Sequence, residues 1–259
     1  MAAWHGVTPI QLAMASLLPV ALAGMASFET RHSTPATGVV REWASLLLIL
    51  AAYGELQWFA TSYSVQWETR LESWDSSLLS MLAPAPNVLT RFSAGIIQAS
   101  YALLYALPPI YLGILYLTGQ RARAGHYLFT LFLGTFTAYL LLPHFPVRAP
   151  RIAFPYLLVP GVITLWGKWN LYLLDRFDIS TSVFPSGHVA VAFSAAFGML
   201  RAVPAKKLIW MSAFFLATCV WAATIYCRYH YAADGAASFL ISIAAWRLSG
   251  RWDPYGLDS

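Results

Sequence analysis

The sequence is poor in charge and in cysteine. Only 10% of its 259 residues are charged, whereas 59% are hydrophobic, and the mean hydropathy is +0.59. This composition lies outside the range of soluble globular domains and indicates an integral membrane protein. The two cysteines, Cys219 and Cys227, fall in one apolar run, so we expect both to pack as small hydrophobic residues. They indicate little about the redox compartment.

The chain also lacks internal repeats, low-complexity tracts and any basic stripe. Its net charge of +5 comes from lysines and arginines scattered through short loops, so we expect no nucleic-acid partner. No basic residue precedes the first apolar run, and no convincing small-residue cleavage site follows it. We therefore expect this run to remain as a helix rather than to be removed as a signal peptide.

Long uncharged runs, in contrast, are abundant. Because a helix crosses the hydrocarbon layer with roughly 20 residues, these runs predict an all-α, polytopic transmembrane bundle of about six to seven spans. We interpret residues 1–259 as a single membrane domain. The expected spans are 8–28, 44–63, 91–121 with a kink at Pro108-Pro109, 127–142, 185–200, 208–227 and 231–246.

Two segments do not fit this pattern. Between residues 66 and 92, tryptophans and leucines alternate with charged residues, which predicts a short amphipathic helix lying in the membrane interface, with an exposed loop as the alternative. Residues 148–184 form the longest segment outside the expected spans. A loop of that length in a compact protein is usually functional.

Basic residues favour one side of the predicted bundle. The side with more of them is expected to be cytoplasmic, which places the motif segments described below on the extracytoplasmic face. The chain would then be a multi-pass protein of a bacterial inner membrane or an equivalent membrane. The residues on the expected cytoplasmic side are Arg31, Arg41, Arg121, Arg123, Arg201, Lys206, Lys207, Arg247 and Arg251.

Pro185-Ser186-Gly187-His188 directly precedes an apolar run. At such a helix start the first backbone N–H groups lack acceptors and the helix dipole is positive, which favours an anion. Ser186 could cap the helix or donate to the anion, Gly187 allows close approach, and His188 could donate a proton. A plain helix start with a structural histidine is the alternative.

His230 and Asp234 are four residues apart, so they share one helical face. A carboxylate that accepts from one imidazole nitrogen leaves the other nitrogen free to attack or to accept a proton. A satisfied buried pair is the alternative. Zinc normally takes three or four ligands, and no cysteine or clustered carboxylate set accompanies this pair, so we expect neither a metal nor another cofactor.

Three segments resemble the signature motifs of the type 2 phosphatidic acid phosphatase superfamily. They are Phe-Pro-Val-Arg-Ala-Pro-Arg at 145–151, Pro-Ser-Gly-His at 185–188 and Arg-Tyr-His-Tyr-Ala-Ala-Asp at 228–234. The resemblance covers residues 143–234 in order and spacing. That superfamily includes membrane lipid phosphatases, haloperoxidases and inositol phosphorylceramide synthases, and hydropathy argues against a soluble haloperoxidase.

The resemblance implies a metal-independent double displacement. His230 would be the nucleophile, with Asp234 orienting it, and His188 would protonate the leaving alkoxide. The groups that would bind the phosphate are Arg148, Arg151, Ser186, Gly187 and Arg228.

Two positions depart from the family pattern. His144 stands where a lysine often begins the first motif, and Thr224 stands where the third motif usually has an arginine. Arg228 is the expected substitute.

The sequence thus predicts a membrane enzyme that removes phosphate from a lipid phosphate or diphosphate. The second hypothesis is a lipid phosphotransferase similar to the inositol phosphorylceramide synthases, in which a lipid alcohol replaces water. A transporter or scaffold with a degenerate site is the third.

Overall fold

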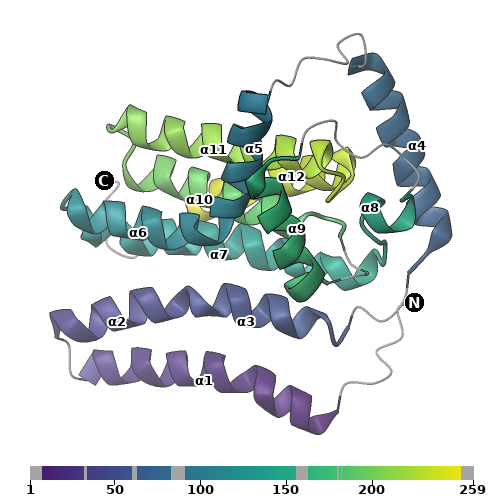
Figure 1. Cartoon of the computed structure of the whole chain (residues 1–259). Helices are drawn as coiled ribbons and strands as arrows, with labels where there is room; N and C mark the ends of the chain where they lie inside the picture. Colours follow the sequence, from purple (N-terminus) through teal and green to yellow (C-terminus); the bar gives the residue numbers. More distant parts are fainter. Residues whose placement is uncertain are drawn as a thin grey trace.

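The computed structural model describes residues 8–31, 34–59, 63–82, 91–155, 163–179, 181 and 183–251. These residues form helices joined by turns and loops, and they include no strand. The predicted all-α class is therefore confirmed (Figure 1).

Helix α10 (Gly187–Ala202) lies at the centre of the bundle. Every residue from Gly187 to Met199 is buried, as expected of a helix that is apolar on all sides. It packs most extensively against α7 (Ala124–Leu141), α11 (Lys207–Tyr226) and α12 (Ala232–Ser249). The second predicted motif therefore begins the most enclosed helix of the protein.

Small residues allow these helices to approach one another closely. A Cβ atom built on Gly198 of α10 would come within 2.9 Å of the backbone oxygen of Tyr127 in α7. Between α10 and α12, the hydroxyls of Ser194 and Ser242 lie 3.0 Å apart. Close contacts of this kind fix the position of α10, and with it the position of His188.

The predicted kink in the third span appears as a change of helix type. Helix α5 (Arg91–Leu103) passes into a 3₁₀ turn (Leu104–Ala106) and then into α6 (Leu107–Leu117). Pro108 and Pro109 occupy the first turn of α6, where proline is tolerated because its missing N–H has no helical acceptor.

The N-terminal helices form a layer beside this bundle. Helix α1 (Pro9–Arg31) lies alongside α2 (Pro35–Ser45) and α3 (Leu47–Leu56), and α3 contacts α7 (Figure 1). The span predicted at 44–63 was misplaced, since the apolar helix runs from Ala36 to Leu56. The physical reason is the start signal at Thr34, whose side chain caps α2 and is followed by a proline in the first turn.

Three further helices of the described chain occur outside the central bundle. The predicted amphipathic helix is present as α4 (Val65–Leu82), and residues 83–90 of that prediction lie outside the described residues. The interpretation of 148–184 as a loop was wrong in part, because α8 (Pro150–Ala153) and α9 (Leu165–Phe177) lie within it. Helix α9 begins at Thr164, whose side chain accepts from the N–H of Gly167, and it packs against α5.

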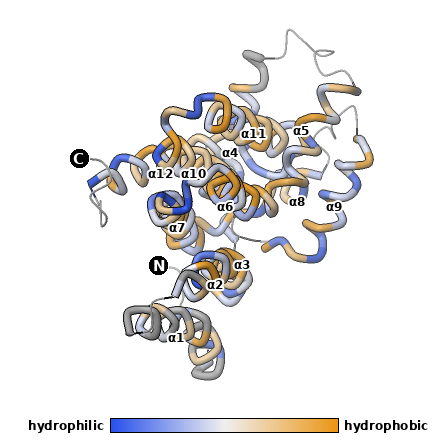
Figure 2. Tube along the Cα trace, turned by 90° about the vertical axis from the view of Figure 1, so that its left-hand side faces the viewer, coloured by the Kyte–Doolittle hydropathy of each residue, from blue (hydrophilic) through white to orange (hydrophobic). Residues whose placement is uncertain are grey.

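Among the described residues, four helical segments are long and apolar enough to cross a membrane: Ala36–Leu56, Phe92–Leu117, Arg121–His144 and Lys207–Tyr226. They mark a membrane protein, and the six to seven spans remain a prediction. Helix α10 is also apolar but shorter. Figure 2 shows hydrophobic residues along most of α11 and hydrophilic stretches on α9.

The contact between α7 and α10 yields a stability prediction. Gly198→Ala should lower the free energy of unfolding by about 1–3 kcal/mol, because a backbone oxygen cannot move aside for the new methyl group. Gly95→Ala in α5 is the matched control, since nothing lies within 4 Å of its Cβ position and alanine favours a helix by about 1 kcal/mol. Thermal unfolding in detergent compares the two. Equal melting temperatures would contradict the close approach of α7 and α10.

Candidate active site

Backbone hydrogen bonds join the three motif segments. The N–H of Arg151 donates to the carbonyl of Arg228 at 3.1 Å, linking the first motif to the third. The N–H of Ser186 donates to the carbonyl of Asp234 at 3.2 Å, linking the second motif to the third. The N–H of Val183 donates to the carbonyl of Val147 at 3.2 Å. Segments far apart in the sequence therefore meet at one end of the bundle.

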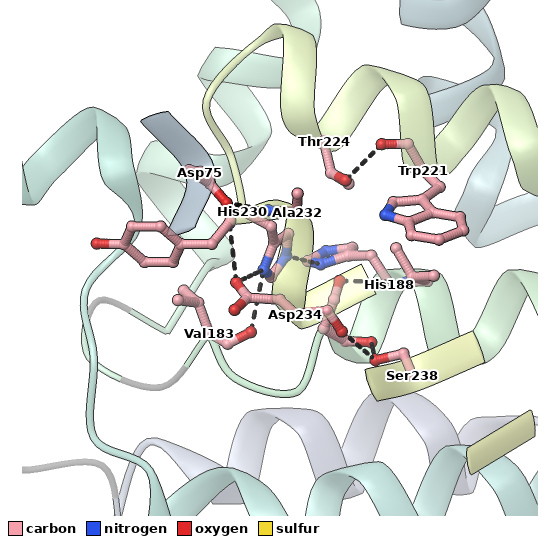
Figure 3. Close-up of polar contacts among 12 residues, drawn as sticks. Asp75, Val183, His188, Trp221, Thr224, His230, Ala232, Asp234 and Ser238 are labelled. Atoms are coloured by element: carbon pink, nitrogen blue, oxygen red, sulfur yellow. Dashed lines mark hydrogen bonds and ion pairs between the residues drawn. The ribbon is translucent and has the colours of Figure 1, made fainter. Parts of the chain in front are cut away.

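His230 lies in the loop between α11 and α12, and both of its ring nitrogens are engaged. Nδ1 lies 3.0 Å from the carbonyl oxygen of Val183 and 3.2 Å from Oδ2 of Asp234 (Figure 3). A carbonyl oxygen only accepts hydrogen bonds, so Nδ1 carries the proton. Burial lowers the pKa of His230 to about 4, although the negative charge of Asp178 acts in the opposite direction. The ring is therefore neutral at pH 7, and Nε2 keeps its lone pair.

This lone pair faces the second predicted histidine. Nε2 of His230 lies 3.2 Å from Nδ1 of His188, and both side chains are buried with 5% of their surface exposed. Since Nε2 of His230 accepts, Nδ1 of His188 is the donor. The potential nucleophile and the potential proton donor therefore contact each other directly.

Asp234 has two structural tasks. It is fully buried, and its Oδ2 accepts from the backbone N–H of Tyr231 at 3.0 Å as well as from His230. The first contact closes the start of α12. One carboxylate thus begins the helix and orients the imidazole, which explains the four-residue spacing.

Ser186 and Gly187 form the start of α10. The hydroxyl of Ser186 accepts from the N–H of Val189 at 3.3 Å, and its carbonyl accepts from the hydroxyl of Ser238 at 2.8 Å. Any Cβ at Gly187 would lie 2.9 Å from the ring of Tyr139, so this position requires a glycine or a shift of that ring. The structure places Ser186 as the helix cap, and the first N–H groups of α10 have no acceptor within the helix.

Each of the three predicted phosphate-binding arginines is paired with carboxylates. Arg148 contacts Glu68 through two nitrogens at 2.8 and 2.9 Å, and Arg228 contacts Glu72 at 2.8 Å. Arg151 lies 3.3 Å from Asp175 and 3.2 Å from Asp178. These carboxylate partners were not among the predicted site residues. The signal was present for α4, because Glu68, Glu72 and Asp75 are spaced to share one face of a helix.

Helix α4 therefore buries acidic side chains toward the motifs. Glu68 and Asp75 are each 2% exposed, whereas Trp74 is 55% exposed. A carboxylate oxygen of Asp75 accepts from the backbone N–H of Ala232 at 2.8 Å (Figure 3). The description of α4 as an interfacial amphipathic helix is thus incomplete, since part of its charged side is held by the third motif.

The two positions that depart from the family pattern have local roles. Nδ1 of His144 lies 3.1 Å from the carbonyl of Leu140 in the preceding turn. The carbonyl of Thr224 accepts from the N–H groups of Tyr229 and His230 at 2.9 and 3.1 Å. Thr224 thus holds the backbone that carries the candidate nucleophile.

Arg228 adopts a left-handed backbone conformation, with φ of 59° just after α11. This conformation is common after the end of a helix, but there it usually belongs to glycine. The arginine side chain is kept despite the strain. A glycine at this position could still accept from the N–H of Arg151 through its carbonyl, but it could not pair with Glu72.

An apolar cavity of about 270 Å³ reaches His188. It lies between α2–α3 on one side and the 3₁₀ turn with α6 on the other, and His188 and Gly187 form part of its wall. The hydroxyl of Tyr105, also in this wall, lies 3.0 Å from Nε2 of His188. The other lining residues are Trp43, Leu46, Leu47, Ile49, Leu50, Tyr53, Leu104, Pro108, Pro109, Tyr139 and Val191.

Within the described ranges, no three side chains of His, Cys, Asp or Glu are grouped so that they could hold a metal ion. The acidic side chain in contact with His230 is Asp234, 3.2 Å from Nδ1.

A family model described as the PAP2 superfamily matches residues 69–248. The chain belongs to this superfamily. No curated protein and no solved structure matches the chain. Members of the PAP2 superfamily are generally phosphatases or phosphotransferases, so phosphoryl transfer is the supported class of chemistry. The matched range holds all three motifs and most of α4, whereas α2 and α3, which supply one wall of the cavity, precede it.

The buried carboxyl of Asp75 gives a prediction about pH. Burial raises its pKa to about 7 from 3.8, so this carboxyl binds an extra proton in the folded protein between these values, and its own contribution to stability falls as pH rises from about 4 to 7. The lowered pKa of buried His230 contributes in the opposite direction. Asp75→Asn keeps an oxygen acceptor for Ala232 and removes the titration. The variant should therefore gain stability relative to the wild type as pH rises, by on the order of 2 kcal/mol at pH 8.

Thermal unfolding from pH 4 to 8 measures this effect. Asp175→Asn is the control, because the Asp175 side chain is 67% exposed. The assignment of a buried, proton-binding carboxyl to position 75 fails if Asp75→Asn keeps the wild-type slope.

Proposed function

We propose that this PAP2 superfamily member is a membrane enzyme that hydrolyses a lipid phosphate or diphosphate through a phosphohistidine on His230. The observation that carries the proposal is the apolar cavity that ends at His188, beside the unprotonated nitrogen of His230. A hydrocarbon chain suits the cavity wall, and the phosphate would then lie at the histidines.

In the first half of the reaction, Nε2 of His230 would attack the phosphorus. A P–N bond forms, the bond from phosphorus to the leaving oxygen breaks, and His188 in its protonated form gives a proton to that oxygen. The positive charge that develops on His230 would be stabilised by Asp234 through Nδ1. Because the two rings now lie 3.2 Å apart, they have to separate before phosphate can enter between them.

In the second half, water would attack the phosphohistidine. His188 takes a proton from the water, the P–N bond breaks, and inorganic phosphate leaves with His230 neutral again. Arg151, Arg148 and Arg228, with the N–H groups at Ser186 and Gly187, are the proposed ligands of the phosphate oxygens. Their carboxylate partners hold the guanidinium groups close to the motifs before substrate arrives.

We also propose that the motif end faces the extracytoplasmic side. Helix α10 begins at the second motif and ends at Ala202, close in the chain to Arg201, Lys206 and Lys207. The excess of basic residues beyond that end supports a cytoplasmic location for it. Exposed Trp67, Trp74 and Trp166 on α4 and α9 would suit the opposite interface.

One observation favours the lipid phosphotransferase as a second candidate. Every predicted phosphate-binding arginine is already paired with a carboxylate, which reduces the positive charge available to a doubly charged phosphomonoester. A phosphodiester carries a single charge and would suit such a site. The transfer of a phospho-headgroup to a lipid alcohol starts from a phosphodiester.

The test uses purified protein in detergent with EDTA and a panel of lipid phosphates, a lipid diphosphate and water-soluble p-nitrophenyl phosphate. Wild-type protein should release phosphate, and His230→Ala should lose at least about a thousandfold in turnover because the nucleophile is absent. The same reactions with phosphodiester lipids and alcohol acceptors test the transferase. A new phospholipid without phosphate release would replace the first candidate by the second.

A cavity variant tests the lipid assignment in the same assay. Leu50→Trp would fill the cavity from α3, so hydrolysis of long-chain substrates should fall about tenfold or more, while that of p-nitrophenyl phosphate should change little. Leu117→Trp is the matched control, since Leu117 is 89% exposed and lies outside the cavity wall. Equal losses on both kinds of substrate would argue against a lipid chain in this cavity.

A further inference from the structure

Three tyrosines surround the ring of His188. Tyr53 from α3 and Tyr105 from the 3₁₀ turn meet it edge to face, each with its ring centre 5.9 Å away, and Tyr101 from α5 lies tilted at 5.3 Å. Their hydroxyl groups have different hydrogen-bond partners. That of Tyr53 donates to Asp178, that of Tyr105 lies 3.0 Å from Nε2 of His188, and that of Tyr101 is buried with no hydrogen-bond partner among the described residues.

Which group donates in the hydrogen bond between Tyr105 and His188 follows from the contacts of His230. The Val183 carbonyl makes Nδ1 of His230 a donor, so Nε2 of His230 accepts and Nδ1 of His188 donates. In the resting site both ring nitrogens of His188 bond to uncharged groups, and the ring takes the neutral form. Its Nε2 is then an acceptor, and the hydroxyl of Tyr105 donates to it.

We infer that Tyr105 is a positioning residue for His188. Its hydroxyl donates to Nε2 and holds the ring with Nδ1–H facing the nucleophile. When His188 becomes protonated, the same hydroxyl can accept from Nε2–H, because a hydroxyl both donates and accepts. Tyr105 thus keeps the ring orientation in both protonation states, and no proton leaves its oxygen.

The location of Tyr105 suits this role. It belongs to the short 3₁₀ turn between α5 and α6, and it also lines the cavity proposed to hold the hydrocarbon chain. Its side chain is 43% exposed, so packing of the ring alone contributes little to stability. Removal of the hydroxyl should therefore affect His188 more than it affects the fold.

The tautomer can be measured without any substrate. Protein labelled with ¹⁵N-histidine in detergent, with His188 assigned by comparison with His188→Gln, is recorded at pH 8. In the wild type, Nδ1 of His188 should resonate as protonated and Nε2 as unprotonated. Tyr105→Phe should keep this tautomer, because Nδ1 still donates to His230, but the Nε2 resonance should move because its hydrogen bond is lost. Tyr101→Phe, which removes an unbonded hydroxyl next to the same ring, should leave the spectrum unchanged.

The kinetic arm rests on the proposed function. Turnover of a lipid phosphate should fall about tenfold in Tyr105→Phe, the effect of one hydrogen bond, with KM unchanged and with no loss in Tyr101→Phe. The inference is overturned if the Nε2 resonance of His188 is the same in Tyr105→Phe as in the wild type, or if it moves without an effect on turnover. If the wild type turns over no phosphate substrate, the proposed function fails by itself, and the spectra still decide the role of Tyr105. Thermal unfolding confirms that each variant is folded.

Discussion

The hydrogen bond between Nδ1 of His230 and the carbonyl of Val183 determines the protonation pattern of the whole site. Since a carbonyl cannot donate, every later donor and acceptor in the series is fixed, through His188 to the hydroxyl of Tyr105. Burial keeps His230 neutral, so its lone pair is available at pH 7. The position of the Val183 carbonyl is fixed in turn, because the N–H of Val183 donates to the carbonyl of Val147 in the first motif.

Charge around the histidines is balanced by pairing rather than by solvent. Helix α4 supplies Glu68 and Glu72 to Arg148 and Arg228, and Asp75 to the backbone at Ala232. Buried pairs of this kind contribute little net stability, but loss of one partner leaves a buried charge and costs about 3–5 kcal/mol. The arrangement therefore holds the arginines in fixed positions beside the motifs. A phosphate that binds there meets oriented donors instead of mobile side chains.

The sequence predicted what depends on local spacing. Helical runs could be identified from composition, and His230 and Asp234 could be paired because residues four apart share a helix face. The meeting of His188 with His230 followed only from the family resemblance, since no local pattern brings α10 to the loop after α11. Tyr105 could not be found in this way, because it lies in an apolar run and only the packing of the 3₁₀ turn and α6 against α10 brings it to His188. The charged side of α4 was visible in the sequence, but its burial depends on arginines in distant segments.

Residues outside the family match also shape the site. Tyr53 comes from α3, which precedes residue 69, and it contacts both Asp178 and the ring of His188. Tyr53 also lines the cavity, so a helix outside the family match contributes to its wall.

The central claim is that His230 is the nucleophile, and the direct measurement is to trap its phosphorylated form. Wild-type protein is mixed with a ³²P-labelled lipid phosphate, quenched in alkali within milliseconds and mapped by peptide mass spectrometry. The account predicts label on His230 that is stable to alkali and labile to acid. Continued turnover with no label on His230, or with label on another residue, would contradict it.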